Sequence, residues 1–595
     1  SLGQAISSTR VTLAADFDIT GVRDDNAEIV GGNDAAEWVV EDVRNLTSVD
    51  ADVGHVWILQ AEDVDNIMFL RSIAVHEVNS DRRVDLKTQG DLMSIGEIVA
   101  GSTISLAGLV DGSGNRLTTL EQLADNNTDS LIIANRLELS DFSTIDLTTE
   151  VDELNIAGVA NLGTADAEFI EIVNEGDVIL DGIFAYINAS VDVSSTGDLT
   201  VREKIQTQED GQFVKLASTG GSVVVSEKDG EEIETVGGDA YVSLSAGDNI
   251  VLNTGIDVKA DGTVYLDADG AIEDATDAAM QPLSLDPTQT REITARTLVI
   301  TDADGIGASD PATPWGWQTN PYALDTNIER LVIAGPAGQA GSDGEAYILE
   351  RNGLPYILAD IEGSLNVATV AGAIGLNAAA PVTNLVDIYS SDGEVVLTAA
   401  TAVTVDMVDA GHGIATLVAQ NGSVLDRDSG APNVIASDIT LLATNGSVGQ
   451  SGNWLDTQTT ASSLTAVATG NGNGIYILNT ALPDADATLT ASTNGNDAPI
   501  YVTQQGGGDL DVIDAKTVDG NMTIEVRDGG DLAASLMNAA DNNPADADTG
   551  ADPLDGNIYL TTVGGGDVNF GSAVAEHLLQ VRSTGQAYSQ TGDHN

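Results

Sequence analysis

The stretch "GGDAYVSLSAGDNIVLNTGIDVKADGTVYLDADGAIED", Gly237–Asp274, shows the pattern that dominates this chain. Short runs of alternating apolar and polar residues begin near Tyr241, Ile250 and Tyr265, and Gly or Asp separates them. Alternation with a period of two over about four to eight residues is typical of a β-strand with one buried face. Gly and Asp favour tight corners, because both tolerate a positive φ. The stretch therefore predicts short strands joined by tight turns.

The same alternation continues along most of the sequence. It is clear in Val11–Gly21, in Gly176–Glu203 and in Gly556–Gly571. Helical spacing is scarce, and we expect helices only at "NRLTTLEQLADN" (Asn115–Asn126) and "SAVAEHLLQ" (Ser572–Gln580). The chain is therefore predicted to be an all-β protein with little helix.

The sequence also contains a longer repeat, in addition to the two-residue alternation. Thr149–Gly176 aligns without a gap with Thr326–Gly353, so that Leu154 matches Leu331. A third copy lies near residues 460–480, with Leu464 and Tyr476 at the corresponding places. Strand positions are kept between copies while loop lengths vary. We predict an N-terminal β-rich part with irregular insertions over residues 1–130 and a continuous repetitive part over residues 131–595.

A short strand with one apolar face cannot bury that face alone. Stacked on copies of itself at about 4.8 Å, it buries a continuous apolar column. Apolar residues make up 42% of the 595 residues but aromatic residues only 4%, which suits a narrow core of aliphatic side chains. We predict a right-handed parallel β-helix, or β-solenoid, with loop insertions. A string of antiparallel β-sandwich domains is the alternative.

The runs "GDAYVSLSAGDNIVLNTG" and "GSVGQSGNWLDTQTTASSLTAVATGNGNGIYILNT" carry a resemblance to known proteins. They resemble the repeats of giant secreted bacterial surface proteins, in particular filamentous-haemagglutinin-type adhesins. The resemblance covers most of Gly176–Gly571 and is one of repeat style. It implies a β-helical rod, export, and a role at the cell surface or in the biofilm matrix. It assigns no catalytic or binding residue.

The charge of the chain limits its partners. It has 93 acidic and 22 basic residues, a formal net charge of −71. A polyanion repels nucleic acid and anionic membrane surfaces, so neither is expected as a partner. Adaptation to a salty medium and calcium binding both explain such a charge. No apolar run approaches the roughly 20 residues of a membrane-spanning helix, so no membrane insertion is expected.

The ends and the cysteine content bear on location. With no Cys, neither a disulfide nor a thiolate site is possible. The sequence starts at Ser1 without a Met or a signal-peptide pattern, which we interpret as a processed product or a segment of a longer chain. We expect an extracellular or cell-surface location.

Calcium is the one cofactor that the sequence suggests. The segment "NNPADADTGADPLDGN" (Asn542–Asn557) gathers four carboxylates, as a hard cation prefers, although it lacks the EF-hand spacing. The segment Gly506–Asp514 is similar to one unit of a Gly-rich calcium repeat, without tandem copies. The alternative explanation for both segments is an acidic loop that is exposed to solvent and binds no metal. The candidate ligands are Asp546, Asp548, Asp552 and Asp555.

Catalytic motifs are absent from the sequence. A calcium-dependent, polysaccharide-cleaving β-helix needs carboxylates together with a basic proton acceptor, but Lys and Arg are few and scattered. No nucleophile elbow or phosphate-binding loop occurs. An enzyme is therefore the least favoured function. The five histidines have no metal-site spacing: His55, His76, His412, His577 and His594.

Aromatic residues mark a candidate site for sugars. The segment Asp310–Thr326 contains Trp315, Trp317 and Tyr322 in what should be a loop. Trp57 and Trp454 are further candidates for stacking on carbohydrate. The alternative is that these rings close a coil or pack against a neighbour.

The coil pattern begins near residue 6 and continues to about residue 588, and neither end reads as a polar cap. Unpaired strands at the ends favour head-to-tail stacking of subunits. We therefore predict a non-enzymatic extracellular structural protein, a self-assembling filament, sheath or surface fibre whose partner is a further copy of itself or another matrix component. An adhesin stalk that binds a glycan or a surface through loop aromatics is the alternative.

Overall fold

The computed structural model confirms an all-β protein built from parallel stacked coils. Before residue 83 and after residue 585 it describes strand backbones only. Between these limits it describes the side chains except at 87–91, 109–117, 123–130, 158–168, 186–188, 209, 227–232, 238, 254–261, 275–292, 309–322, 336–339, 376–384, 392, 428–431, 461–462, 482–485 and 540–555. No helix occurs in the described part of the chain, and so none there is long and apolar enough to cross a membrane.

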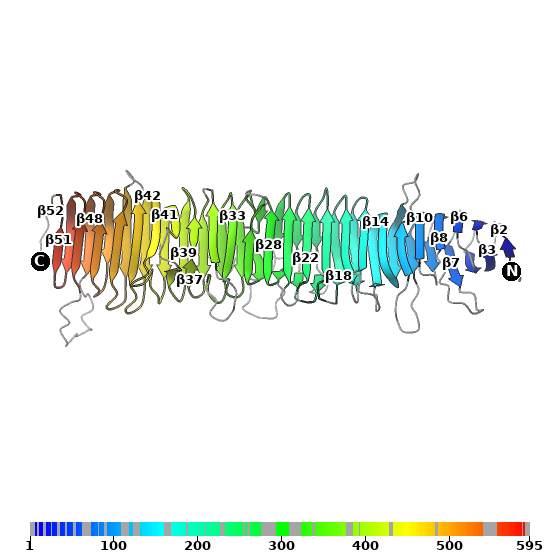
Figure 1. Cartoon of the computed structure of the whole chain (residues 1–595), viewed down its shortest axis with the longest axis horizontal. Coiled ribbons are helices and arrows are strands. Elements are labelled where there is room, and N and C mark those ends of the chain that lie inside the picture. Colours follow the sequence, from blue (N-terminus) through cyan, green and yellow to red (C-terminus); the bar gives the residue numbers. More distant parts are fainter. Residues whose placement is uncertain are drawn as a thin grey trace. The chain divides into compact units, whose positions relative to one another are not determined.

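The chain divides into two units. Unit 1 consists of Ser1–Thr276 and Thr290–Arg296, and unit 2 of Asp277–Gln289 and Thr297–Asn595. Unit 1 contains strands β1 (Ile6–Ser8) to β27 (Ile293–Thr294), coloured blue to green in Figure 1. Unit 2 contains strands β28 (Thr297–Asp302) to β52 (Ala587–Ser589), coloured green to red.

The opening stretch, Gly237–Asp274, shows how a coil of unit 1 is made. It forms β22 (Tyr241–Ala246), β23 (Ile250–Leu252), β24 (Ile256–Val258), β25 (Thr263–Ala268) and β26 (Ala271–Asp274). Strand β22 pairs in parallel with β25, β23 with β26, and β24 with β27. Three strands therefore complete one coil, and the fourth strand begins the next coil directly above the first.

In unit 2 the coil beyond residue 434 uses two named strands. Strand β43 (Ile475–Ala481) pairs with β45 (Ile500–Gln505), which pairs with β47 (Met522–Val526). On the other side, β42 (Leu455–Ala468) pairs with β44 (Ala487–Thr493). Leu464 lies opposite Leu489, so this coil advances 489 − 464 = 25 residues.

The core is a set of aliphatic columns, as the composition predicts. In unit 1, Val191, Val214, Val242 and Val264 occupy equivalent places in four successive coils, and all four are completely buried. Each side chain sits on the one below, so a single inward position repeated along the chain fills the interior without voids. Of the aromatic side chains, Phe142 is completely buried.

The long repeat of the sequence corresponds to equivalent inward positions. Leu154 on β14 (Phe142–Val159), Leu331 on β31 (Arg330–Ile333) and Leu464 on β42 are all buried. The aromatic position differs between copies: Tyr347 on β32 (Ala346–Glu350) is buried, whereas Tyr476 on β43 is only half-buried. The copies therefore preserve the aliphatic column more closely than the outer surface.

The two predicted helices are wrong. Within Asn115–Asn126 the chain forms strand β12 (Thr118–Gln122), and within Ser572–Gln580 it forms the end of β50 (Val568–Ala575) and the start of β51 (Leu579–Arg582). Strand β12 pairs with β10 (Leu92–Ala100) and β14 on its two sides. Because both neighbours offer backbone hydrogen bonds at strand spacing, tertiary pairing overrides the local helical spacing.

Candidate functional site

Both groups of predicted site residues lie outside the described residues. The proposed calcium loop falls in 540–555 and the proposed aromatic loop in 309–322. Their roles stay predictions. The residues concerned are Asp546, Asp548, Asp552, Asp555, Trp315, Trp317 and Tyr322.

Acidic residues at the described corners bind the backbone of the next coil. The Asp531 N–H donates to Oδ1 of Asp509 at 2.7 Å, and the Asp567 N–H donates to Oδ1 of Asp531 at 2.7 Å. The glycines before these aspartates are needed, since Gly507 has φ +90° and Gly565 has φ +120°. The Gly-Asp motif of Gly506–Asp514 therefore stabilises a corner.

Metal ligation is the alternative role for the acidic corners of the described ranges. There, no group of three or more His, Cys, Asp or Glu side chains has an arrangement that could hold a metal ion. The repeating Gly-Asp corners have a sufficient explanation in backbone hydrogen bonding, because a carboxylate that accepts an N–H from the next coil links the two coils directly.

A second hydrogen-bonded carboxylate is buried at a corner of unit 2. Glu350, at the end of β32, is completely buried. Its Oε2 accepts hydrogen bonds from Thr326 Oγ1 and from the Ile328 N–H, both at 2.9 Å, and its Oε1 accepts one from the Asn352 N–H at 2.8 Å. Two of these donors are backbone groups that would otherwise lack an acceptor, so this carboxylate holds the corner together.

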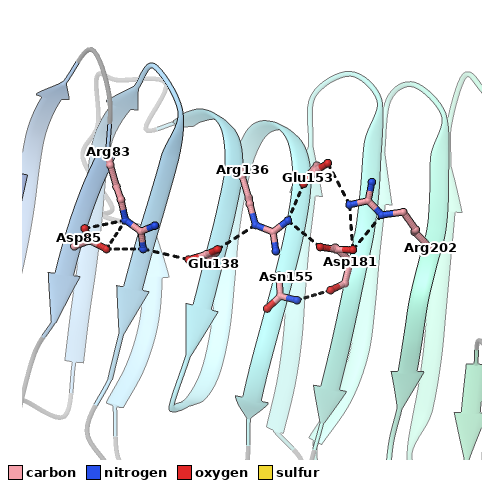
Figure 2. A network of polar contacts seen from close by, with 8 residues as sticks. All are labelled: Arg83, Asp85, Arg136, Glu138, Glu153, Asn155, Asp181 and Arg202. Atoms are coloured by element: carbon pink, nitrogen blue, oxygen red, sulfur yellow. Dashed lines mark hydrogen bonds and ion pairs between the residues drawn. The ribbon is translucent and has the colours of Figure 1, made fainter. Parts of the chain in front are cut away.

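The most extensive polar site is an ion-pair network on unit 1, shown in Figure 2. Arg136 on β13 (Ile132–Ser140) contacts Glu138 at 3.1 Å, Glu153 at 2.7 Å and Asp181 at 2.8 Å. Arg202 on β18 (Leu199–Gln206) contacts Glu153 at 3.1 Å and Asp181 at 3.0 Å. The two guanidinium groups thus share two carboxylates that come from the coils between them.

The network extends to a strand two coils before Arg136. Arg83 on β9 (Arg83–Lys87) contacts Asp85 at 2.9 Å and reaches Glu138 at 3.3 Å. At the other end, Asn155 donates a hydrogen bond to the carbonyl of Asp181 on β16 (Val178–Ala185). Three arginines and four carboxylates therefore form a chain of contacts in which charges of opposite sign alternate.

The electrostatics of the network favour the ionised state. Burial alone would raise the pKa of Asp181, but hydrogen bonds and charge attraction from Arg136 and Arg202 outweigh it and lower the pKa below the ordinary 3.8. For Arg136, burial lowers the pKa, and hydrogen bonds with Asp181, Glu153 and Glu138 raise it by more. A carboxylate held ionised by two guanidiniums is a poor proton donor, so the arrangement suits structure better than acid–base chemistry.

The outer surface also carries two aromatic ladders, which we define by their residues. The unit 2 ladder consists of Trp454, Tyr476 and Tyr501, and the Tyr476 and Tyr501 rings stack at 5.5 Å between centroids with 14° between planes. Trp454 lies 6.2 Å from Tyr501. The unit 1 ladder consists of Phe169, Phe213, Tyr241 and Tyr265, with centroids 5.9, 5.1 and 5.9 Å apart in that order.

Sequence reasoning missed the network and the unit 1 ladder, and of the unit 2 ladder it identified Trp454 but not the two tyrosines. A local signal for the network was present, because Arg83 and Asp85, and likewise Arg136 and Glu138, lie two residues apart and therefore on the same face of a strand. For the ladders the signal was an aromatic residue at an outward position in successive runs, such as Tyr476 and Tyr501. What was lacking was the register that places these residues one above the other.

Comparison with known proteins adds no closer assignment. No family model matches the chain, and neither a curated protein nor a solved structure matches it significantly. The class that the fold defines is the parallel β-solenoid.

We predict that Asp181→Asn destabilises unit 1 in a pH-dependent way. At pH 7 the free energy of unfolding in urea should fall by about 1–2 kcal/mol, because two guanidiniums lose a charged acceptor. The native pKa lies below the unfolded one, so this stabilisation is complete above pH 3.8 and disappears as the pH falls through the lowered pKa. The wild type and the variant should therefore converge below pH 3.8.

The matched control for this experiment is Asp192→Asn. Asp192 is 37% exposed and lies 3.6 Å from Lys215, so its loss should change stability by less than about 1 kcal/mol. Equal effects of the two substitutions at pH 7 would contradict the structural role of the network.

Glu350→Gln should destabilise unit 2 by about 1–3 kcal/mol, measured by equilibrium unfolding. Both oxygens of Glu350 accept hydrogen bonds, so the amide NH2 of Gln would face a donor at a completely buried position. Glu362→Gln, at an exposed position on the same unit, is the control and should have no effect. A variant at Glu350 as stable as this control would show that the buried carboxylate does not hold the corner.

Proposed function

We propose that this chain is a non-enzymatic, extracellular structural protein, a self-assembling filament, sheath or fibre at a cell surface. The observation that carries the proposal is the unbroken aliphatic column, in which side chains such as Val214, Val242 and Val264 repeat in successive coils. In such a column each coil makes the same contact with the next coil, so a stack of coils gains length and stiffness as coils are added. A mechanical role uses that property directly.

The surface agrees with this proposal. A net charge of −71 favours solubility and disfavours lateral aggregation of the sheets. The resemblance of the repeats to those of filamentous-haemagglutinin-type adhesins favours the same setting, a large exported protein at the surface of a bacterium. The polar corners, with Asp509 and Asp531 as examples, link coil to coil through hydrogen bonds between a carboxylate and a backbone N–H.

Self-assembly is supported by the last coil that the structure describes in full. Ile558 and Leu560 on β49 (Ile558–Thr562) are completely buried, whereas their partners Leu579 and Val581 on β51 are partly exposed. An aliphatic position that is covered in one coil and open in the next fits the addition of a further β-coil. We propose that a second copy supplies that coil.

Negative-stain electron microscopy of the purified full chain tests this proposal. We expect filaments in the wild type and none in a Leu579→Asp, Val581→Asp double variant, because two carboxylates in the apolar column prevent stacking. Gln580→Asp, which adds a charge at the outward position between them, should still polymerise. Single particles in the wild type would contradict self-assembly.

Repeating the experiment with calcium and then with a chelator tests the cofactor. If calcium bound by Asp546, Asp548, Asp552 and Asp555 bridges subunits, filaments should form with calcium and disappear in chelator. Filaments that are unchanged in chelator would refute a structural calcium site.

A further inference from the structure

The unit 2 ladder, Trp454, Tyr476 and Tyr501, lies on the outward face of unit 2. Tyr476 is flanked along its strand by the inward residues Ile475 and Ile477, both completely buried, so alternation directs its ring outward. The same holds for Tyr501 between Ile500 and Val502. Both tyrosine rings therefore point away from the core and are partly exposed.

The backbone makes room for the ring of Tyr476. A Cβ on Gly474 would lie 2.8 Å from Cε2 of Tyr476 and 2.8 Å from the carbonyl of Pro499. Any larger residue at position 474 would therefore displace the ring from its stack on Tyr501. The ladder thus has a fixed geometry, with its rings nearly parallel at 14°.

A row of hydrogen-bonding side chains lies on the same face as the ladder, with the row of Asp456, Leu478 and Thr503 between them. Gln458 is the register partner of Thr480, and Thr480 that of Gln505. Gln505 Nε2 donates to Thr480 Oγ1 at 3.1 Å, and all three residues are half-exposed. Tyr476 and Thr480 lie four residues apart on one strand and therefore point to the same side. The face thus combines aromatic rings with amides and hydroxyls.

This combination fits one class of ligand, and we propose that the unit 2 ladder binds a neutral linear polysaccharide. The C–H faces of pyranose rings stack on aromatic side chains, and their equatorial hydroxyls pair with amides and hydroxyls. Successive coils repeat at about 4.8 Å, close to the advance of one sugar in an extended β-linked chain, so successive rings meet successive sugars. The charge of −71 repels polyanionic glycans and leaves neutral ones as the ligand.

The competing explanation is that the ladder only stabilises the stack of coils. Cross-strand aromatic pairs contribute to sheet stability in this way. The unit 1 ladder fits that explanation, because Lys215 lies 4.7 Å from the Phe213 ring and also contacts Asp192, so ions occupy its flank. In unit 2 the corresponding row, two residues along each strand, consists of Asp456, Leu478 and Thr503, and the row of Gln458, Thr480 and Gln505 follows two residues further on. Binding of glycan and stability must therefore be measured together.

The test is a pull-down of the purified full chain on cellulose, a neutral β-1,4-linked glucan, with soluble alginate, a polyanion, as competitor. Wild type should bind cellulose, and alginate should not compete. Tyr476→Ala with Tyr501→Ala should weaken binding by about tenfold or more, because two stacking platforms are lost. Tyr389→Ala is the matched control, since Tyr389 is 46% exposed and lies outside both ladders; it should bind as the wild type does.

A second variant separates binding from folding. Thr523 is the register partner of Tyr501 in the next coil, so Tyr501→Thr places in this column a residue that it already contains. Its thermal midpoint should stay close to that of the wild type while cellulose binding falls. The proposal is overturned if the wild type does not bind cellulose, if alginate competes fully, or if Tyr501→Thr binds as the wild type does.

Discussion

The parallel hydrogen bond between equivalent residues of successive coils is the constraint on which this structure depends. It fixes the spacing at about 4.8 Å and places each residue above its counterpart one coil earlier. Val214 thus lies under Val242, and Tyr476 under Tyr501. Residues at the same position in successive coils therefore form a column along the unit.

Each kind of column has its own requirement. Inside, aliphatic side chains of similar size stack closely, and most of the described core is built from them. At the corners, carboxylates of Asp509 and Glu350 accept backbone N–H groups that the turns leave free. On the outer surface, like charges in register would repel each other. On the acidic surface of unit 1, Arg136 and Arg202 therefore form ion pairs with carboxylates of neighbouring coils. Aromatic residues are left for outward positions, where they stack as ladders.

The sequence predicts the inward columns well and the outward ones poorly. Alternation alone identified β22 and β23, because burial of one face requires a period of two. It failed at Thr118–Gln122, where Leu117, Leu120 and Leu123 also have helical spacing and only pairing with β10 and β14 selects the strand. Arg136 and Asp181 are 45 residues apart, and their contact depends on the lengths of the coils between them. The register that creates an outer site is a property of the fold.

The register itself is therefore the quantity to measure, and the absence of native cysteine makes this direct. Thr465 and Thr490 are outward register partners, so a Thr465→Cys, Thr490→Cys variant should form a disulfide under mild oxidation. Thr465→Cys with Ser492→Cys, displaced by two residues, should stay reduced, because Ser492 is the partner of Val467. A disulfide in the second variant and none in the first would contradict the coil register on which the whole account depends.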